Sequence, residues 1–171
     1  FQYAVAKKLV VLSFDDGPHP VYTPQILEVL HSEGVHAVFF VVGAQVAAYP
    51  NILKRISDGG HEIGNHTYSH TLTEAALEHD ISSEISDTSQ LVEKLTGSPT
   101  RWVRPVGGAL SAAFVRAAES TGHTIVLWNV DTQDWRAARS WGRSDEIRLS
   151  VSDTPLGNGS VILMHDGGGY R

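Results

Sequence analysis

The sequence predicts an α/β protein whose parallel strands form a sheet, either open or closed into a barrel, with helices packed outside it. The main observation is that apolar segments of strand length alternate with amphipathic segments of helix length along the chain. A second is that ionisable residues recur at the ends of the predicted strands, where parallel folds gather their functional groups. The composition, 42% hydrophobic and 19% charged over 171 residues, is ordinary for a globular protein, and we expect residues 1–171 to form one domain.

The first half of the chain supplies three predicted strands and two helices. Residues 8–14, "KLVVLSF", form a nearly continuous apolar run that is typical of a strand covered on both faces. Thr23 and Pro24 are expected to be the N-cap and first residue of a helix that ends near Gly34. A second buried strand is predicted at 37–42, a helix at 51–58, and a short strand at 62–64.

The second half continues the alternation. A long amphipathic helix is predicted at 78–95, with an acidic face that we expect to be solvated and with Gly97 as its end. A strand at 101–104 precedes a helix at 111–120, for which Ser111 is a suitable N-cap. A fifth strand is predicted at 124–128, a helix at 145–152, and a sixth strand at 160–164.

Composition excludes several classes of function. The net charge of −6 argues against a general nucleic-acid surface. No apolar run is long enough to cross a membrane, and residues 1–8 lack the pattern of a signal peptide. The absence of cysteine excludes thiolate catalysis, disulfides and Cys-ligated zinc.

The polar residues at the strand ends should meet at one rim of the sheet, because the carboxyl ends of parallel strands lie together. Scattered turn residues could account for the aspartates, but they would not readily supply two histidines and an arginine as well. The residues concerned are Asp15 and Asp16, Asn65 and His66, Arg104, Asp131, and His165 and Asp166.

One segment indicates a metal site. In "HTYSH" the side chains of His66 and His70 are four residues apart, and on a helical turn they would share a face. With Asp16 as a third ligand they would form a site with an open position, which is the usual form of catalytic zinc. The histidine pair alone is weak support, because surface or core histidines also occur at this spacing.

Five motifs occur in order along the chain: "SFDDGP", "HTYSH", "RPVGG", "DTQDW" and "LMH". Together they resemble the polysaccharide deacetylases, carbohydrate esterase family 4, over nearly the whole chain. The resemblance implies a distorted (β/α) barrel of the seven-stranded type. It also implies a metal-dependent hydrolase that removes acetyl groups from chitin, chito-oligomers, peptidoglycan or acetylxylan. We expect the protein to be secreted or at the cell surface and to act as a monomer.

The resemblance also implies a role for each motif residue. Asp16, His66 and His70 would hold a divalent metal, with Zn²⁺ as the first choice and Co²⁺, Ni²⁺ or Mn²⁺ as alternatives. Asp15 would be the base that deprotonates metal-bound water, and Arg104 would pair with it.

On the other side of the reacting group, His165 would be the acid that protonates the leaving atom, and Asp131 would orient it. Trp135 and Leu163 would wall a pocket for the acetyl methyl group. The backbone N–H of Gly107 would help to bind the oxyanion.

Two features depart from the family pattern. Gly107 stands where the family usually has an aromatic residue, so the N–H remains while a ring that walls the groove is lost. Family members generally continue beyond the fifth motif with a helix and a closing strand, whereas this chain stops at Arg171. We therefore expect a barrel without its C-terminal closing elements, with one edge open.

Two other functions stay open from the residues alone. The altered third motif would also suit a pseudoenzyme that binds glycan without turnover. Two histidines and a carboxylate could hold iron in an oxygenase, although that alternative leaves Asp15, Arg104 and His165 without a role.

Overall fold

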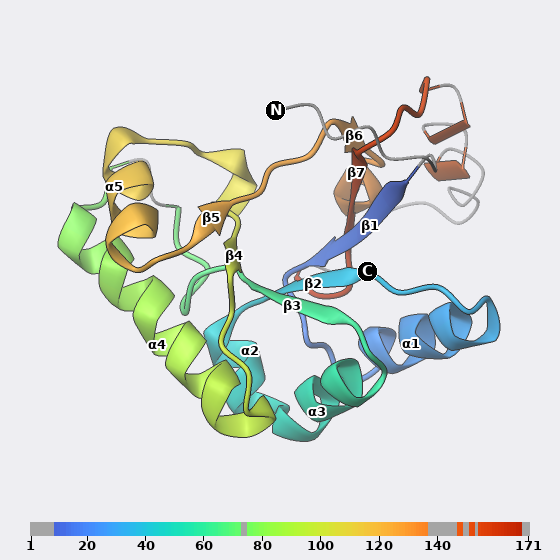
Figure 1. Ribbon diagram of the computed structural model, residues 1–171, viewed down its shortest axis with the longest axis horizontal. Helices are drawn as coiled ribbons and strands as arrows, with labels where there is room; N and C mark the ends of the chain where they lie inside the picture. Colours follow the sequence, from blue (N-terminus) through green and yellow to red (C-terminus); the bar gives the residue numbers. More distant parts are fainter. Residues whose placement is uncertain (1–8, 73–74, 137–146, 149–150, 153, 169–171) are drawn as a thin grey trace.

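Seven parallel strands form a single curled sheet in the order β5-β4-β3-β2-β1-β7-β6. The computed structural model describes residues 9–72, 75–136, 147–148, 151–152 and 154–168 (Figure 1). The sheet is a half-barrel that is open between its two edge strands, β5 and β6, which confirms the predicted distorted (β/α) barrel with an open edge. The strands are β1 Val10–Asp15, β2 Val38–Val41, β3 Glu62–Asn65, β4 Trp102–Val103, β5 Thr124–Ile125, β6 Val130–Asp131 and β7 Ser160–His165.

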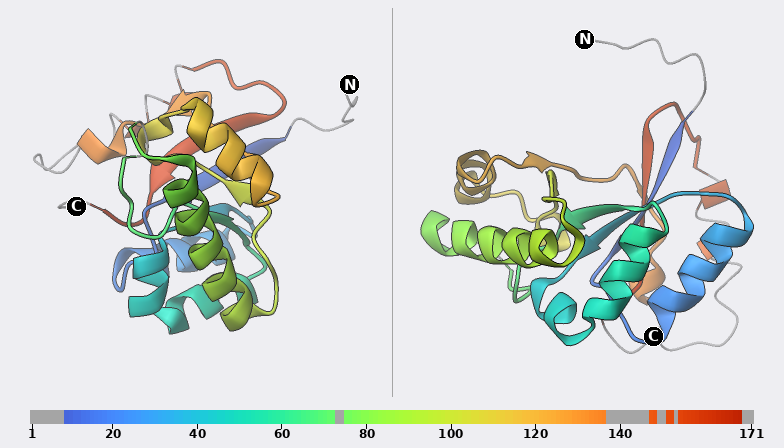
Figure 2. Two further views of the ribbon diagram at one scale, coloured as in Figure 1. Left: turned by 90° about the vertical axis from the view of Figure 1, so that its left-hand side faces the viewer. Right: turned by 60° about the horizontal axis from the view of Figure 1, so that its bottom comes forward.

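Helices α1 to α5 lie outside the half-barrel, in two groups (Figure 2). The first group follows β1 and β2 and packs behind them, and the second, α4 with α5, lies beside β3 and β4. The helices are α1 Tyr22–Ser32, α2 Gly43–Ala48, α3 Pro50–Asp58, α4 Glu78–Thr96 and α5 Ala112–Ser120, and the short 3₁₀ turns are η1 Val106–Gly108 and η2 Asp134–Arg136.

Strand alternation separates the core from the lumen of the half-barrel. In β1, Phe14 packs outward, where its ring stacks on that of Phe39 at a centroid distance of 5.1 Å. Its neighbours Ser13 and Asp15 point to the other face, where they line cavities. Because β1 and β7 pair with Asp15 opposite His165, their inward residues meet in the same layer.

Two hydrophobic clusters hold the helices in place. The larger one joins β1 and β2 to α1, α2, α3 and the C-terminal half of α4, and the smaller one joins β4 to α5 and the N-terminal half of α4. Phe39, Leu53 and Ile56 of the first cluster are fully buried, as is Phe114 of the second. Burial of each such side chain contributes about 1.5–3 kcal/mol to the stability of the fold. The strands whose ends carry the polar residues are therefore held in place by a well-packed core.

Several elements differ from the sequence prediction. Helix α1 begins at Tyr22 with no side-chain cap, so Thr23 is not its N-cap. The Thr23 hydroxyl instead donates to the buried carboxylate of Asp166, which needs a donor more than the exposed helix end does. By contrast, the side chain of Ser111 accepts from Phe114 N at the start of α5, as predicted.

Other differences concern the number and length of elements. Helix α2 was not predicted, and the strand expected at 124–128 is shorter, ending at Ile125, with the separate strand β6 beginning at Val130. The intervening residues cross from β4 to β7: Val126 N donates to Val103 O, and Asn129 N donates to Val161 O. Of the helix predicted at 145–152, residues 147–148 and 151–152 are described and are helical, and the other four lie outside the described residues.

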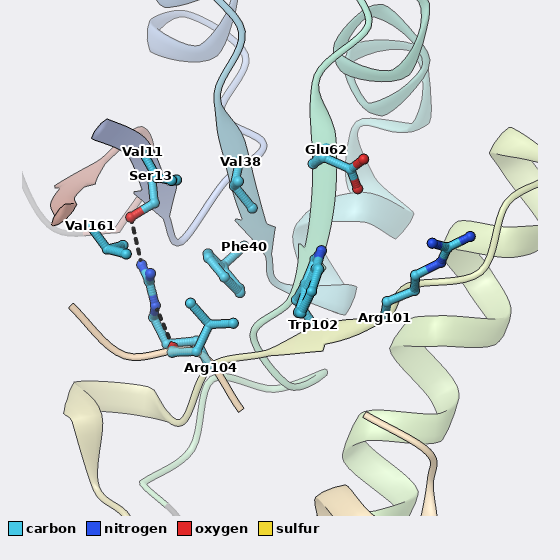
Figure 3. A pocket seen from close by; sticks show the side chains of 10 residues that line it. Val11, Ser13, Val38, Phe40, Glu62, Arg101, Trp102, Arg104 and Val161 are labelled. Atoms are coloured by element: carbon cyan, nitrogen blue, oxygen red, sulfur yellow. Dashed lines mark hydrogen bonds between the residues drawn. The ribbon is translucent and has the colours of Figure 1, made fainter. Parts of the chain in front are cut away.

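A cavity of about 330 Å³ occupies the half-barrel at the end where the strands begin (Figure 3). Its lining is mostly apolar, with Val11, Val38, Phe40 and Trp102 among the contributors, and the buried side chain of Arg104 reaches it from one side. None of the helices in the described part of the chain has the length and apolarity needed to cross a bilayer.

Candidate metal centre and catalytic cavity

The two adjacent aspartates reach the same rim because the backbone changes direction between them. Asp15 is the last residue of β1 and points into the half-barrel, whereas Asp16 has a left-handed φ of 75°. Continued strand geometry would send the second side chain to the opposite face, and aspartate is one of the few residues that adopt the left-handed region readily. The turn therefore places both carboxylates beside His66, whose Nε2 lies 3.7 Å from Asp15 Oδ2 and 3.4 Å from Asp16 Oδ1.

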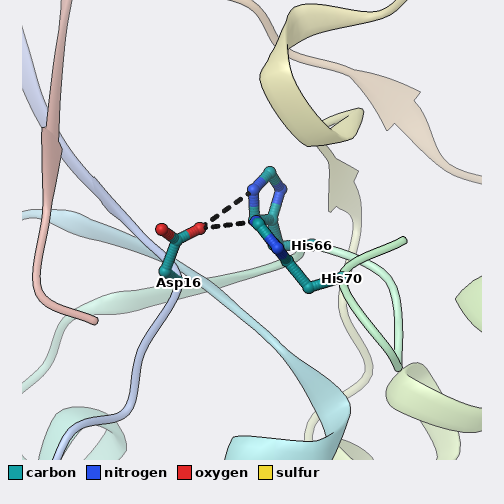
Figure 4. Close-up of side chains that lie close together, drawn as sticks. All are labelled: Asp16, His66 and His70. Atoms are coloured by element: carbon teal, nitrogen blue, oxygen red, sulfur yellow. Dashed lines mark ion pairs between the residues drawn. The ribbon is translucent and has the colours of Figure 1, made fainter. Parts of the chain in front are cut away.

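His66 and His70 share a loop rather than a helical turn, so that part of the sequence prediction is wrong. The loop follows β3 directly, and Thr67 and His70 have left-handed φ values of 67° and 57°. These turns nevertheless bring the two imidazoles together, and His70 Nε2 lies 2.9 Å from Asp16 Oδ1 (Figure 4). Side chains four residues apart thus converge through loop geometry.

The donor atoms of Asp16, His66 and His70 fit a divalent metal. All three lie within 4.8 Å of one another, and tetrahedral zinc with bonds of 2.0–2.2 Å places neighbouring ligands about 3.3 Å apart. His66 Nδ1 lies 2.8 Å from the carbonyl oxygen of Arg104, which can only accept, so Nδ1 carries the proton. Nε2 of the neutral ring therefore turns a lone pair toward two carboxylates, an arrangement that a cation would stabilise.

The electrostatics agree with this placement. Burial acts to raise the pKa of Asp16, but hydrogen bonds and charge from His66 and His70 hold the pKa well below its usual range. Burial acts to lower the pKa of His66, but the charges of Asp15 and Asp16 outweigh it and raise the pKa. Without a cation the carboxylates and the imidazoles favour one another's charged forms, and a bound dication would take the place of the imidazole protons.

Asp15 has a different partner from Asp16. Arg104 Nη1 donates to Asp15 Oδ1 at 2.6 Å and also to Ser13 Oγ at 3.0 Å, and both charged side chains are buried. The guanidinium lies 3.9 Å from the Phe40 ring centroid, and its Nε donates to the carbonyl of Val126. Burial raises the pKa of Asp15, while the charges of His66 and Arg104 act to lower it.

His165 is bound by Asp134, not by the predicted Asp131. His165 Nδ1 lies 2.7 Å from Asp134 Oδ1, and His165 N donates to Asp134 Oδ2 at 2.8 Å. Asp131 ends β6 and its Oδ1 accepts from Gln133 N, so its carboxylate stabilises the turn that brings Asp134 back to the histidine. The fourth motif, "DTQDW", contains both aspartates, and the fold places the second of them, Asp134, against the imidazole of His165.

These groups share one cavity of about 380 Å³. Every residue predicted for the site lines it except Arg104, which lies behind Asp15; Val106 and Trp128 also line it and were not predicted. The complete lining is Asp15, Asp16, His66, His70, Val106, Gly107, Trp128, Asp131, Trp135, Leu163 and His165.

The walls of the cavity differ in exposure. Leu163 is buried, whereas Trp135 is 46% exposed and stands at the rim. Gly107 has a left-handed φ of 61°, and a Cβ added there would meet only Leu72 Cδ2, at 3.7 Å. The cavity therefore has an apolar inner wall and an open side at the position of the glycine.

Comparison with known proteins finds a matching family and similar sequences. The sequence model of the polysaccharide deacetylase family matches residues 2–126. A peptidoglycan-N-acetylglucosamine deacetylase of Bacillus cereus is 39% identical over 93% of this chain, and the alignment covers 56% of that protein. The chain thus spans little more than half of that relative's length.

Solved structures with this fold are also found. The peptidoglycan deacetylase PdaC of Bacillus subtilis superposes with a TM-score of 0.84 at 35% identity, covering 94% of this chain and 76% of that one. A family 4 carbohydrate esterase pseudoenzyme of Bacillus anthracis superposes with a TM-score of 0.86 at 29% identity, covering 95% of this chain and 56% of that one. The chain belongs to the polysaccharide deacetylase family.

Proposed function

We propose that this protein is a metal-dependent hydrolase that removes acetyl groups from N-acetylglucosamine polymers, with peptidoglycan or chito-oligomers as its first candidate substrates. The observation that carries the proposal is that the Asp16–His66–His70 donor set shares one cavity with the Arg104-bound carboxylate Asp15 and the Asp134-bound imidazole His165. A deacetylase needs these three parts: a Lewis acid, a base and an acid. O-acetyl xylan is a further candidate, since the same groups can cleave an ester.

Asp16, His66 and His70 would hold the metal, with zinc as the first choice because the donor set is two imidazoles and one carboxylate. Co²⁺, Ni²⁺ and Mn²⁺ are the alternatives. When bound, the dication would polarise the acetyl carbonyl and lower the pKa of a coordinated water.

Asp15 accepts the proton of the attacking water. The Arg104 guanidinium binds Oδ1 and favours the ionised carboxylate against the effect of burial, while Oδ2 faces the metal ligand His66. The water oxygen adds to the acetyl carbon, and the C–N bond, or the C–O bond of an ester, then breaks to release acetate. We propose that the Gly107 N–H donates to the oxyanion formed on the way.

His165 supplies the proton that the leaving nitrogen or oxygen takes up. Its Nδ1 faces a carboxylate oxygen of Asp134 and so carries a hydrogen, which leaves Nε2 as the nitrogen that serves the cavity. The backbone bond from His165 N to the same aspartate adds a second point of contact. Leu163 and Trp135 supply apolar surface for the acetyl methyl group.

A second candidate is a pseudoenzyme that binds glycan without turnover. Gly107 removes the aromatic side chain that the family usually places at the cavity, and one similar structure belongs to a family 4 pseudoenzyme. The presence of every proposed ligand, base and acid in the cavity favours turnover instead.

Acetate release separates these candidates. The metal content is measured first, and the zinc-loaded protein is then incubated with chito-oligomers, peptidoglycan and acetylxylan. Acetate from at least one polymer supports the deacetylase, and the polymer identifies the substrate class. Glycan binding with no acetate from any of them, at full metal occupancy, would support the pseudoenzyme. Since these polymers lie in cell walls, we propose a secreted or cell-surface protein, and we expect size-exclusion chromatography to show a monomer.

A further inference from the structure

The two histidines of the proposed metal site are held in unequal ways. The His66 ring is buried, and its Nδ1 is bonded to the carbonyl oxygen of Arg104, which fixes both the tautomer and the ring orientation. The His70 side chain is 40% exposed, and its Nδ1 has no hydrogen-bond partner among the described residues. A ligand without such a bond depends on its backbone for its position.

The backbone just before His70 is bound by Glu84, from the second turn of α4. Glu84 Oε2 accepts from Tyr68 N at 2.8 Å and from Ser69 N at 2.6 Å. Its other oxygen, Oε1, accepts from Ser69 Oγ at 2.9 Å. One half-buried carboxylate thus receives three hydrogen bonds from the two residues that precede the ligand.

The start of α2 holds the opposite side of the same loop. Gly43 N donates to Thr67 O at 3.0 Å, and Ala44 N donates to Tyr68 O at 2.9 Å. A Cβ at Gly43 would overlap the Tyr68 ring and the Thr88 hydroxyl, so the loop packs directly on the helix backbone there. The carbonyl groups of residues 67 and 68 thus accept hydrogen bonds from α2, and the amide groups of residues 68 and 69 donate to Glu84. The two peptide units that precede the ligand are therefore held on both sides.

We propose that Glu84 is a positioning residue that sets the metal affinity of the site, because it holds the backbone that places His70 against Asp16. The inference rests on the metal-dependent function proposed above. Two other acids on α4 lie elsewhere: Glu78 pairs with Arg116 near the start of the helix, and Glu93 is exposed in the last turn.

The test is the dissociation constant for zinc, measured by competition with a chromophoric chelator, for the protein and three variants. Glu84→Ala removes the acceptors and should weaken binding about 10- to 100-fold, the range usual for groups that orient metal ligands. In Glu84→Gln the side-chain oxygen can still accept from both amides, so its affinity should lie closer to that of the unaltered protein. Glu93→Ala, from the same helix, should leave the affinity unchanged.

Two further measurements separate positioning from a general loss of structure. The visible absorption of the cobalt-loaded protein should change in Glu84→Ala and not in Glu93→Ala, because it reports the arrangement of the ligands. In a His70→Ala background, Glu84→Ala should weaken zinc binding no further, since the two residues act through one contact.

Each alternative outcome has a distinct meaning. If the unaltered protein binds no zinc or cobalt, the proposed metal-dependent function falls. If it binds metal and Glu84→Ala binds equally well, or the two losses add in the double variant, the role of Glu84 is refuted while the function stands. Equal losses in Glu84→Gln and Glu84→Ala would show that charge acts rather than the hydrogen bonds, which also overturns the positioning role.

Discussion

Asp134, and not Asp131, holds His165: its carboxylate accepts from the backbone nitrogen and lies 2.7 Å from Nδ1 of the same residue. The two aspartates are three positions apart, and both are near the cavity that holds the proposed site. Asp131 lines the cavity, but it is Asp134 that contacts the imidazole. This division has a direct consequence for turnover.

Asp134→Asn should lower kcat by about 100-fold or more, because His165, the proposed acid, loses the carboxylate that orients it and stabilises its charged form. Asp131→Asn is the matched control. Its amide oxygen can still accept from Gln133 N, so turnover should change little. A larger loss in Asp131→Asn than in Asp134→Asn would reverse the assignment. Acetate release under saturating substrate is the measurement.

Asp15→Asn should keep its affinity for zinc and lose turnover by about 100-fold or more, because an amide cannot take up the proton of the attacking water. Asp16→Asn should do the opposite and weaken zinc binding, since the ligand loses its charge. A zinc titration and an acetate assay on both variants check this. Full activity in Asp15→Asn, or unchanged zinc affinity in Asp16→Asn, would contradict the division of labour between them.

Arg104→Met should destabilise the fold by about 3–5 kcal/mol, the range for breaking a buried ion pair. The loss has a structural cause as well, because Arg104 Nε and Nη1 bond to Val126 O and Ser13 Oγ. Arg101→Met changes an exposed arginine only three residues away and should alter the free energy of unfolding by less than about 1 kcal/mol. Denaturant unfolding of the metal-free variants gives both values.

Stability should fall as the pH rises through the range in which Asp166 ionises. Burial raises the pKa of this carboxyl to about 7, against an unfolded value near 3.8. Below pH 3.8 Asp166 is protonated in both the folded and the unfolded protein, and its full contribution to the free energy of unfolding is present. Between pH 3.8 and about 7 only the folded protein keeps the proton, so this contribution decreases as the pH rises. Above pH 7 a contribution of about 4 kcal/mol is lost. Asp166→Asn cannot ionise, so the free energy of unfolding should lose this part of its pH dependence.

Two glycines should respond differently to alanine. Gly107→Ala meets no atom closer than 3.7 Å and should cost only the left-handed backbone penalty of about 1–2 kcal/mol, with zinc affinity intact. In Gly43→Ala the new methyl overlaps Tyr68 and Thr88, so the loop that carries His70 has to move and zinc should bind more weakly. Thermal unfolding and zinc titration distinguish the two. Equal zinc affinities would show that the loop tolerates displacement.

The sequence predicted the sheet and most of the rim because both depend on local patterns. The apolar runs of β1, β2 and β7 are long enough to be recognised, and the motifs place nine of the ten predicted site residues around one cavity, with Arg104 directly behind it. Ser111 and Gly97 mark helix ends by intrinsic preference, and both do so in the structure.

The features that the sequence did not predict depend on contacts between residues far apart in the chain. The left-handed turn at Asp16 and the loop course from His66 to His70 follow from packing that no local pattern encodes. Glu84 lies 15 residues from Ser69 on an acidic helix face that resembles a solvated surface, so only the folded chain shows its bonds. The choice of Asp134 over Asp131 likewise depends on how the turn after β6 folds back.

The crossing from Val126 to Asn129 connects the two open edges of the half-barrel. Strands β5 and β6 are neighbours in the chain, yet they are the two outer edges of the sheet, so a short covalent tether spans the gap that a hydrogen-bonded seam would fill in a closed barrel. Trp128 lies within this tether and lines the cavity, and Val126 accepts from Arg104. The wall of the cavity at this gap is therefore a connecting segment, hydrogen-bonded to β4 at one end and to β7 at the other, in place of a strand pairing.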